Sequence, residues 1–411
     1  MVPNGWSAKP LADIVKEKIS YGIVQAGPHV PDGIPYIKSS DVRGTINPYS
    51  LQRTSQEIHF KYRRSSVHPG DIVFSLRGNI GESAIVPASL PEANLTQGTA
   101  RISVSAEHSN QFHYYQLASE KILNRINALS KGSTFKEISL EELRKVKVLC
   151  APLPEQKKIA KILSTWDRVI STTEQLLANS QQQKKALMQQ LLTGKKRLLD
   201  NNGVRFSGEW KAQRIGSLLK EVKRPVQWDD DSEYHLLSVK RRSEGVVLRE
   251  ILKGSDILTK KMNTALAGDF LISKMQVVHG ATGLVTEEFN KCHISDSYIA
   301  LRPKDDEKID IAFFSWFSKQ KIMYHKAFLC SYGVHIEKMT FNFNMFVKEK
   351  VVIPATLEEQ QKIAAVLSTA DQEITTLQQK LDALKQEKKA LMQQLLTGKL
   401  RVKEPKEEVA C

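Results

Sequence analysis

An internal repeat is the feature that most constrains this chain, because one helical segment occurs twice at a spacing of 204 residues. EQKKIAKILSTWD begins at Glu155, and EQQKIAAVLSTAD begins at Glu359. KKALMQQLLTGK occupies residues 184–195 and returns unchanged at residues 388–399. Because both pairs share one spacing, the whole segment is duplicated without insertion, and we expect one structural unit to be used twice.

Each copy predicts one long helix. Apolar residues recur at alternating spacings of four and three, which places them on one stripe, as in a coiled coil. Neither segment contains proline, and Gly194 and Gly398 stand where a C-terminal cap is expected. A helix from Glu155 to Leu192 would be about 57 Å long at ~1.5 Å per residue.

The stripe predicts the seam of an intramolecular coiled coil, in which the two helices pair with each other. The alternative is that each helix packs on its own globular domain as an ordinary amphipathic helix. Thr173, Ser180 and Lys184 are polar members of the first stripe, and Lys388 is the polar member of the second. We expect both lysines, and the lysine that follows each, to form an exposed rim. The apolar seam residues are Ile159, Leu163, Trp166, Ile170, Leu177, Leu187, Leu191, Ile363, Leu367, Ile374, Leu377, Leu381, Leu384, Leu391 and Leu395.

Two globular segments are interleaved with the helices and share one plan. GWSAKPLADI near Trp6 aligns with EWKAQRIGSL near Trp210, and PGDIVFS resembles AGDFLIS. Short apolar runs bounded by Gly and Pro predict strands, and residues 111–129 and 311–329 each predict a helix. The predicted parts are a first recognition-like domain (1–152), a first helix (153–199), a second domain (200–354), a second helix (355–400) and a disordered tail (401–411).

The composition favours a polyanionic partner. The net charge is +15 and the sequence pI is about 9.4, and Lys and Arg displace counterions from phosphates. The alternative is a generally basic soluble protein. No apolar run approaches the roughly 18 residues of a membrane span, and the N-terminus lacks a signal-peptide layout. The four cysteines are scattered without a Cys/His motif for zinc, so we expect a cytoplasmic, reduced protein with no metal and no membrane contact.

These features together resemble the specificity (S) subunit of a type I restriction-modification enzyme. The resemblance covers nearly the whole chain. Its carriers are the domain starts at Gly5-Trp6 and Glu209-Trp210, the exits PLPEQKKIA (152–160) and LEEQQKIA (357–364), and the two helices that end in LMQQLLTGK. The two extra residues between Pro354 and Glu359 leave open where the second helix begins.

The resemblance implies two α/β (α+β) recognition domains and two long helices that pair antiparallel and hold the domains apart. It also implies a chain without catalytic residues, in which each domain reads one half of a split target in double-stranded DNA. Two methyltransferase (M) subunits would dock on this frame, and restriction/motor (R) subunits would join them. The chain itself would hold no cofactor, because S-adenosylmethionine and ATP/Mg would bind the partner subunits.

Arg, Lys, Asn, Gln, Ser and Thr on loops read base edges, while nearby cations contact phosphates, so polar and basic loop residues are the candidates for contacts with DNA. A solvated surface loop is the alternative for each of them. In the first domain they are Lys38, Ser39, Ser40, Arg43, Arg77, Asn79, Lys131, Ser133, Thr134 and Lys136. In the second domain they are Lys240, Arg241, Arg242, Lys274, Gln276, His279, His335 and Lys338.

Several catalytic signatures are missing from the sequence. There is no Pro-Pro-aromatic loop of a DNA aminomethyltransferase, no G-x-G-x-x-G, no P-loop around Gly194, and no H-E-x-x-H. A self-contained DNA enzyme is therefore disfavoured. A structural coiled-coil adaptor for protein partners stays as the second interpretation. The salt dependence of binding distinguishes this adaptor from a DNA-binding subunit, because DNA binding weakens steeply with ionic strength.

Overall fold

The computed structural model describes residues 2–132, 136–333, 335–336 and 339–402. The chain divides into two compact units. Unit 1 is formed by residues 1–175 together with 379–411, and unit 2 by residues 176–378. Each unit therefore contains one globular domain, one part of the first long helix and one part of the second.

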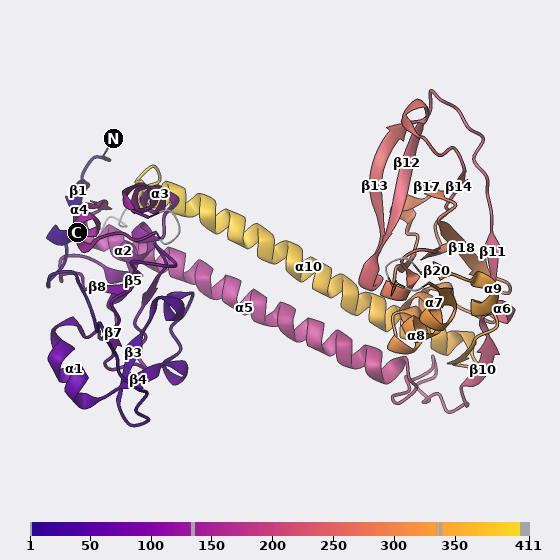
Figure 1. Ribbon diagram of the computed structural model, residues 1–411, viewed down its shortest axis with the longest axis horizontal. Helices are drawn as coiled ribbons and strands as arrows, with labels where there is room; N and C mark the ends of the chain where they lie inside the picture. The colour runs from indigo at the N-terminus through magenta and orange to yellow at the C-terminus, as the bar shows by residue number, and fades with distance from the viewer. Residues whose placement is uncertain (1, 133–135, 334, 337–338, 403–411) are drawn as a thin grey trace, which may run out of the picture. The chain divides into compact units, whose positions relative to one another are not determined.

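The two long helices are copies of each other in extent. Helix α5 spans Leu153–Leu191 and helix α10 spans Leu357–Leu395, with 39 residues each (Figure 1). Both helices begin two residues before the predicted Glu-Gln start, and they occupy positions 204 residues apart. The two extra residues between Pro354 and Glu359 therefore do not shift the start of the second helix relative to the repeat. Gly194 and Gly398 follow them with φ of 70° and 66°, in the left-handed conformation that a helix C-cap favours.

The globular domain of unit 1 is built on three small sheets (Figure 1). A four-stranded sheet has the order β2-β8-β5-β6, a three-stranded sheet has the order β4-β3-β7, and β1 pairs with β9. The β3–β7 pair is parallel and the other pairs are antiparallel. The strands are β1 (Ser7–Pro10), β2 (Ser20–Tyr21), β3 (Ile34–Ile37), β4 (Gln52–Thr54), β5 (Ile72–Ser75), β6 (Ser83–Ile85), β7 (Asn94–Leu95), β8 (Thr99–Ile102) and β9 (Lys147–Cys150), and the helices are α1 (Gln56–Tyr62), α2 (Asn110–Leu117), α3 (Glu120–Leu129) and α4 (Leu140–Lys145).

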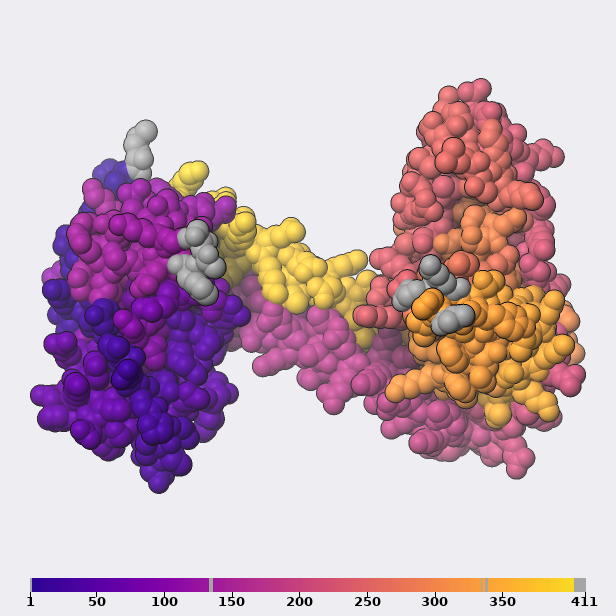
Figure 2. Space-filling model, viewed as in Figure 1, coloured from indigo at the N-terminus to yellow at the C-terminus, as the bar shows by residue number. Residues whose placement is uncertain are grey.

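The globular domain of unit 2 repeats this plan with longer strands. Its sheets have the orders β11-β18-β15-β16 and β13-β12-β17-β14, and β10 pairs with β21 as β1 pairs with β9. Strands β12 and β13 extend away from the rest of the unit (Figure 1), and this part of the chain forms the projecting surface of the unit in Figure 2. The strands are β10 (Lys211–Arg214), β11 (Leu219–Val222), β12 (Glu233–Lys240), β13 (Gly245–Lys253), β14 (Met262–Thr264), β15 (Phe270–Ser273), β16 (Thr282–Leu284), β17 (His293–Ser295), β18 (Tyr298–Pro303), β19 (Ser331–Tyr332), β20 (Thr340–Phe341) and β21 (Lys350–Ile353), and the helices are α6 (Ile215–Leu218), α7 (Ile311–Ser318), α8 (Lys321–Leu329) and α9 (Phe343–Phe346).

One helix predicted in each domain is two helices. The predicted helix over 111–129 breaks between α2 and α3, because Ser119 has extended backbone with ψ of 142° and its hydroxyl donates to the carbonyl of Gln116 at 2.6 Å. Such side-chain bonds compete with the helical ladder. In unit 2 the break falls at Gln320, whose ψ is 148°. The prediction of single helices was wrong because hydrophobic periodicity does not register a one-residue break.

The long helices pack against each other within each unit, and the start of one lies beside the end of the other. In unit 1, Ile159 and Leu163 of α5 share a core with Leu395 and Leu396 of α10. In unit 2, Leu191 of α5 shares a core with residues 363–367 of α10. The pairing is therefore antiparallel in both units. No predicted seam residue is exposed, and Ile159, Leu163, Leu191 and Leu367 are almost completely buried.

Two of the four lysines predicted as an exposed rim are half-buried. Lys184 pairs with Asp371 in unit 2, and Lys388 pairs with Asp167 in unit 1. Both ammonium groups also lie over an aromatic ring of the adjoining domain, at 5.1 Å from the Trp316 centroid and 5.5 Å from that of Tyr115. The rim prediction was wrong for these two, because an unpaired charge would be costly at a seam position.

The Glu-Gln dipeptide that begins each copy joins a helix to its surroundings. Glu155 accepts hydrogen bonds from Trp6 Nε1 at 3.0 Å and from Arg401 Nε and Nη2 at 2.8 and 2.9 Å. Glu359 accepts two from Arg197, at 2.5 and 2.7 Å. Each arginine follows the end of the opposite helix. The start of each repeat is thus fixed by the end of the other, which the repeat spacing alone does not reveal.

The following glutamine is fully buried in both units and connects the helix to its own domain. Gln156 Oε1 accepts from the backbone N–H of Ser109, the N-cap of α2, at 2.8 Å. Gln360 Oε1 accepts from the N–H of Asp310, the N-cap of α7, at 2.9 Å. Both amide nitrogens donate to backbone carbonyls of the exit segment. These bonds give the Glu-Gln pattern a structural reason, because buried polar groups need partners.

Among the described residues, no helix combines the length and the apolar character needed to cross a membrane.

The predicted tail at 401–411 lies outside the described residues from 403 onward. Its first residue, Arg401, is bonded to Glu155 and to the carbonyl of Asn4.

Candidate nucleic-acid interface

Three predicted loops of unit 1 meet at one end of strand β5. The backbone N–H of Leu76 donates to Gly98 O at 2.8 Å, and Leu76 O accepts from the N–H of Ile138 at 3.0 Å. Ser39 Oγ donates to the same Gly98 carbonyl at 2.9 Å. A Cβ on Gly98 would lie 2.8 Å from that hydroxyl, so any side chain at this position would displace Ser39 Oγ. The loop that contains Gly98 was not among the predicted ones.

Polar side chains bridge these loops. Arg43 donates to Asn79 Oδ1 at 2.5 Å, and Asn79 Nδ2 donates to Ser39 O at 3.4 Å. Arg77 forms an ion pair with Glu137 at 3.3 Å, and its buried Nε has no hydrogen-bond partner in the described structure. The site therefore holds a cation whose donors are incompletely used, at the mouth of three converging loops.

The remaining candidates of unit 1 differ in position. Lys38 is turned toward Gln52, whose Oε1 accepts from its Nζ at 3.3 Å, and Ser40 bonds Asp41. Lys131 and Lys136 are exposed on the loop that carries Glu137. The predicted residues Ser133 and Thr134 lie outside the described residues.

In unit 2 the basic turn between β12 and β13 has strained backbone. Arg242 and Ser243 have φ of 58° and 55°, which non-glycine residues rarely adopt. Ser243 N donates to Gly280 O at 2.8 Å, which fixes the turn against the 3₁₀ helix Val277–His279. Lys240, Arg241 and Arg242 are exposed on this turn. Such strain is typical of backbone held for a functional purpose.

The loop after β15 brings other predicted residues beside this turn. The N–H of Lys274 donates to Ser297 O at 2.9 Å, and its carbonyl accepts from Phe341 N at 3.1 Å. Lys274 Nζ donates to Asp296 O at 2.5 Å. Gln276 and His279 are half-buried in the same loop, and Gln276 Oε1 has no hydrogen-bond partner among the described residues. His335 is exposed between β19 and β20, and Lys338 lies outside the described residues.

The same backbone position carries different chemistry in the two units. Leu76 and Lys274 make equivalent backbone bonds. Each N–H donates to the residue just before β8 or β18, and each carbonyl accepts from the segment before the last short helix of its domain. The next residue is Arg77 in unit 1 and Met275 in unit 2, and the Met275 side chain is 43% exposed. Two domains with one framework and different side chains at the loop tips are suited to two different ligands of one kind.

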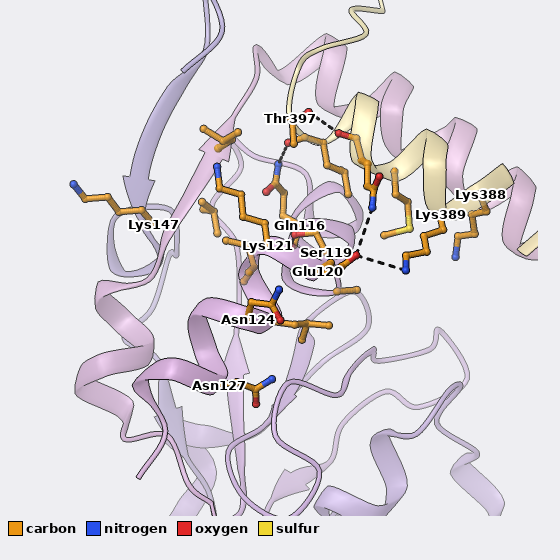
Figure 3. A pocket seen from close by; sticks show the side chains of 18 of the residues that line it. Gln116, Ser119, Glu120, Lys121, Asn124, Asn127, Lys147, Lys388, Lys389 and Thr397 are labelled. Carbon is orange, nitrogen blue, oxygen red and sulfur yellow. Dashed lines mark hydrogen bonds and ion pairs between the residues drawn. The ribbon is translucent and has the colours of Figure 1, made fainter. Parts of the chain in front are cut away.

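Unit 1 also contains a large cavity between α3, β9 and the C-terminal end of α10 (Figure 3). Its volume is about 1170 Å³. Lys389 and Gln393 both contact Glu120 across its rim, and Gln116 Nε2 donates to Leu396 O at 2.8 Å. Leu123, Leu149 and Met392 supply apolar lining. This arrangement of an apolar floor and a charged rim is typical of surfaces that bind a protein segment.

Tertiary structure brings together a group that the sequence did not indicate. His108, His113 and Cys150 each place one ligand-type atom within 4.8 Å of the others. Burial lowers the pKa of His113 to about 3, and the neighbouring His108 acts in the same direction. Burial also raises the pKa of Cys150 to about 11. The three residues are spread over 43 positions, so no spacing motif signals them.

The class defined by this fold is a duplicated recognition protein, with two loop-bearing α/β domains on a pair of antiparallel helices. The model of the type I restriction modification DNA specificity domain matches residues 3–180 and again residues 209–386. The chain belongs to this family.

Two curated relatives are named as specificity subunits of type I restriction enzymes. The EcoBI specificity subunit of Escherichia coli is 29% identical over 165 residues, which are 39% of this chain and only 35% of that protein. The MjaVIII specificity subunit of Methanocaldococcus jannaschii is 23% identical over 98% of this chain and 94% of its own length.

Solved structures share the fold. The S subunit of a type I restriction-modification system from M. genitalium gives a TM-score of 0.59 at 14% identity and covers 96% of this chain and 97% of that one. A chain from a study of complex assembly and conformational transition in the type I R-M system gives 0.52 at 17% identity and covers 97% and 100%.

Proposed function

We propose that this chain is the DNA sequence-specificity subunit of a type I restriction-modification complex, and that each unit reads one half of a bipartite target. The observation that carries the proposal is the repeated loop framework with different side chains at equivalent tips, Arg77 in one unit and Met275 in the other. Two related units on one duplex read two half-sites, as dimeric readers do.

Readout is assigned to the converging loops. Arg77 has the fork geometry that bonds guanine O6 and N7, and its side chain is 41% exposed where the loops converge. The exposed Lys240, Arg241 and Arg242 on the strained turn are proposed to contact bases or phosphates of the other half-site. Lys131, Lys136 and Lys274 are proposed as phosphate contacts, because they are cations at the loop edges.

The chain is proposed to be non-catalytic. S-adenosylmethionine, ATP and Mg²⁺ would bind partner subunits. The paired helices would dock two methyltransferase subunits, and restriction/motor subunits would join the complex. The cavity bounded by α3 and α10 is proposed as one contact site, because its apolar floor and the rim of Lys389, Glu120 and Gln393 suit a partner segment. Lys389→Glu should weaken methyltransferase capture without changing DNA binding by the isolated chain.

Helix length is proposed to set the spacer between half-sites. At ~1.5 Å per residue a 39-residue helix is about 58 Å long, which corresponds to at most ~17 base pairs at ~3.4 Å each. Inserting one heptad into both α5 and α10 at paired positions should lengthen the unread spacer. An unchanged spacer in such a variant would contradict the proposal that helix length sets the spacer.

A map of methylated bases tests the whole proposal. Cells with the chain should methylate a bipartite motif with a fixed gap, and cells without it should lose that methylation. Restoring the chain as Arg77→Ala should relax one base in one half-site only and leave the other half-site intact. Lys196→Ala, outside the loops, serves as the matched control and should restore the full motif. If no motif depends on the chain while the partner subunits are active, the adaptor interpretation replaces this one.

A further inference from the structure

The group of His108, His113 and Cys150 lies at the point where the domain of unit 1 joins helix α5. His108 precedes the N-cap of α2, His113 lies within α2, and Cys150 ends β9. Gln156, in the first turn of α5, donates to Ala151 O at 2.7 Å and contacts His108 Nδ1 at 3.2 Å. The three side chains thus come from two elements that meet at the helix start.

Unit 2 provides an internal control for this location. Its elements α7 and β21 correspond to α2 and β9, and β10 pairs Lys211 with Ile353 as β1 pairs Ser7 with Cys150. Aligning the N-caps of α2 and α7, Ser109 and Asp310, makes His108 and His113 correspond to Ile309 and Phe314. These two residues and Ile353 are buried in the apolar core of unit 2. The framework therefore accepts three apolar side chains at this place and does not require polar ones.

In unit 1 two imidazoles and a thiol stand in place of these apolar side chains, which costs folding free energy. Buried polar atoms are unfavourable unless they have partners. His113 is completely buried, and its Nδ1 has no hydrogen-bond partner among the described residues. The hydrogen bonds of the protein thus leave this imidazole incompletely satisfied, and they do not account for a histidine at this position.

The spacing of the two histidine nitrogens suits a tetrahedral metal. His113 Nε2 and His108 Nδ1 are 3.4 Å apart. Two nitrogens bound to Zn²⁺ at ~2.0–2.1 Å in a tetrahedron are separated by about 3.3 Å. The Cys150 sulfur completes a set of atoms that all lie within 4.8 Å of one another. Imidazole and thiolate are the donors that favour Zn²⁺ over Mg²⁺ or Ca²⁺.

A second cavity gives access to the group. It has a volume of about 320 Å³ and is lined by His108, Cys150, Trp6, Lys9 and Glu107. A water molecule from this cavity, or the Glu107 carboxylate, can supply a fourth ligand. Lys9 adds a positive charge that opposes a cation but favours the thiolate, and Glu107 adds a negative charge that favours the metal.

We propose that His108, His113 and Cys150 form a Zn²⁺ site in unit 1 that clamps α2 to β9 at the start of α5. Binding forms one Zn–S and two Zn–N bonds and releases the Cys150 thiol proton to solvent. Both imidazoles stay neutral: the proton of the ligating nitrogen of His113 moves to Nδ1, and the Gln156 amide gives up its contact with His108 Nδ1 while keeping Ala151 O. The clamp has no counterpart in unit 2, so it stiffens one of the two domain–helix junctions.

The test is metal binding by the full chain after removal of metal with EDTA. Zn²⁺ should bind at one equivalent per chain in competition with a chromophoric chelator, and Co²⁺ in its place should give a thiolate-to-metal charge-transfer band. Cys150→Ile and His113→Phe introduce the residues that unit 2 uses, so the fold should tolerate them. Each should weaken Zn²⁺ binding at least ~10-fold and abolish or shift that band. Cys330→Ala, which removes a buried thiol of unit 2, is the matched control and should change neither.

Two outcomes would overturn the site. One is the absence of saturable binding by the wild-type chain. The other is binding that Cys150→Ile and His113→Phe leave unchanged. If either variant fails to fold, alkylation of the wild-type chain decides. Bound Zn²⁺ should protect Cys150 from iodoacetamide relative to the metal-free chain, and equal modification of Cys150 in both would reject the proposal.

Discussion

Replacing Glu155 with alanine should open the junction where the end of α10 meets the start of α5. The carboxylate is 8% exposed, and it accepts bonds from Trp6, from two nitrogens of Arg401 and from the N–H of Val402 at 3.2 Å. Removing one partner of a buried ion pair costs about 3–5 kcal/mol. The Arg401 side chain is 36% exposed, so solvent screening reduces the expected cost to about 2–3 kcal/mol.

Native-state hydrogen exchange measures this cost locally, because the chain has two units and a single unfolding free energy is not defined for it. Amides of residues 153–160 and 396–402 should exchange about 30- to 150-fold faster in Glu155→Ala, since each 1.4 kcal/mol is a factor of ten. Glu387→Ala removes an exposed carboxylate from α10, the other helix of this junction, and should change the free energy of local opening by less than about 0.5 kcal/mol.

A double-mutant cycle isolates the ion pair. Glu155→Ala combined with Arg401→Ala should cost less than the sum of the single changes, by about 1–2 kcal/mol, because the second change removes a bond that is already lost. Strict additivity, or exchange in Glu155→Ala equal to that in Glu387→Ala, would refute the reasoning.

The pH dependence of the same junction has a definite sign. Burial alone would raise the pKa of Glu155, but hydrogen bonds from Arg401 and Trp6 outweigh it and leave this pKa below its ordinary value. A carboxyl whose folded pKa is depressed contributes stability above its unfolded pKa of about 4.3 and loses it as the pH falls through the folded pKa. The protection of the junction amides, taken relative to their intrinsic exchange rate at each pH, should therefore fall on acidification below about pH 4.3 in the wild type, and Glu155→Ala should remove that fall.

Three further predictions concern stability at other points. Asp371→Ala should destabilise the helix pair of unit 2 by about 1–2 kcal/mol, and combining Asp371→Lys with Lys184→Asp should recover part of it, as measured by hydrogen exchange. Ser139→Ala removes the N-cap of α4, whose hydroxyl accepts from Glu142 N at 3.2 Å, and should cost about 1 kcal/mol in the exchange of that helix. Asp269→Ala should cost unit 2 about 3–5 kcal/mol, because this fully buried carboxylate bonds two arginines; a loss below ~1 kcal/mol in limited proteolysis would contradict its role.

The helices were predictable because their signal is local and periodic. The spacing of the apolar residues predicts which helix face is buried, as it does for Ile363, Leu367, Ile374 and the later leucines. The identical run repeated 204 residues away predicts a second helix with the same buried face. A long periodic segment without proline has few alternatives to a helix. The partner of each face followed from the match between the two stripes.

The loop sites were predictable only in kind. Residue types and flanking glycines indicated which loops could contact DNA, but the meeting of Ser39, Asn79 and Glu137 depends on strand order and register. The break at Ser119 was missed because one extended residue leaves the hydrophobic pattern intact.

By itself the sequence determined the duplication, the extent and pairing face of the helices, the two-domain plan and the family. Only the tertiary structure decided that Arg401 fixes Glu155, that Lys184 and Lys388 are ion-paired and lie over aromatic rings, and that His108 and His113 meet Cys150. The physical reason is the range of the forces involved. Periodicity and capping act within a few residues and are written in the local sequence, whereas ion pairs and ligand groups depend on which distant segments the hydrophobic core brings into contact.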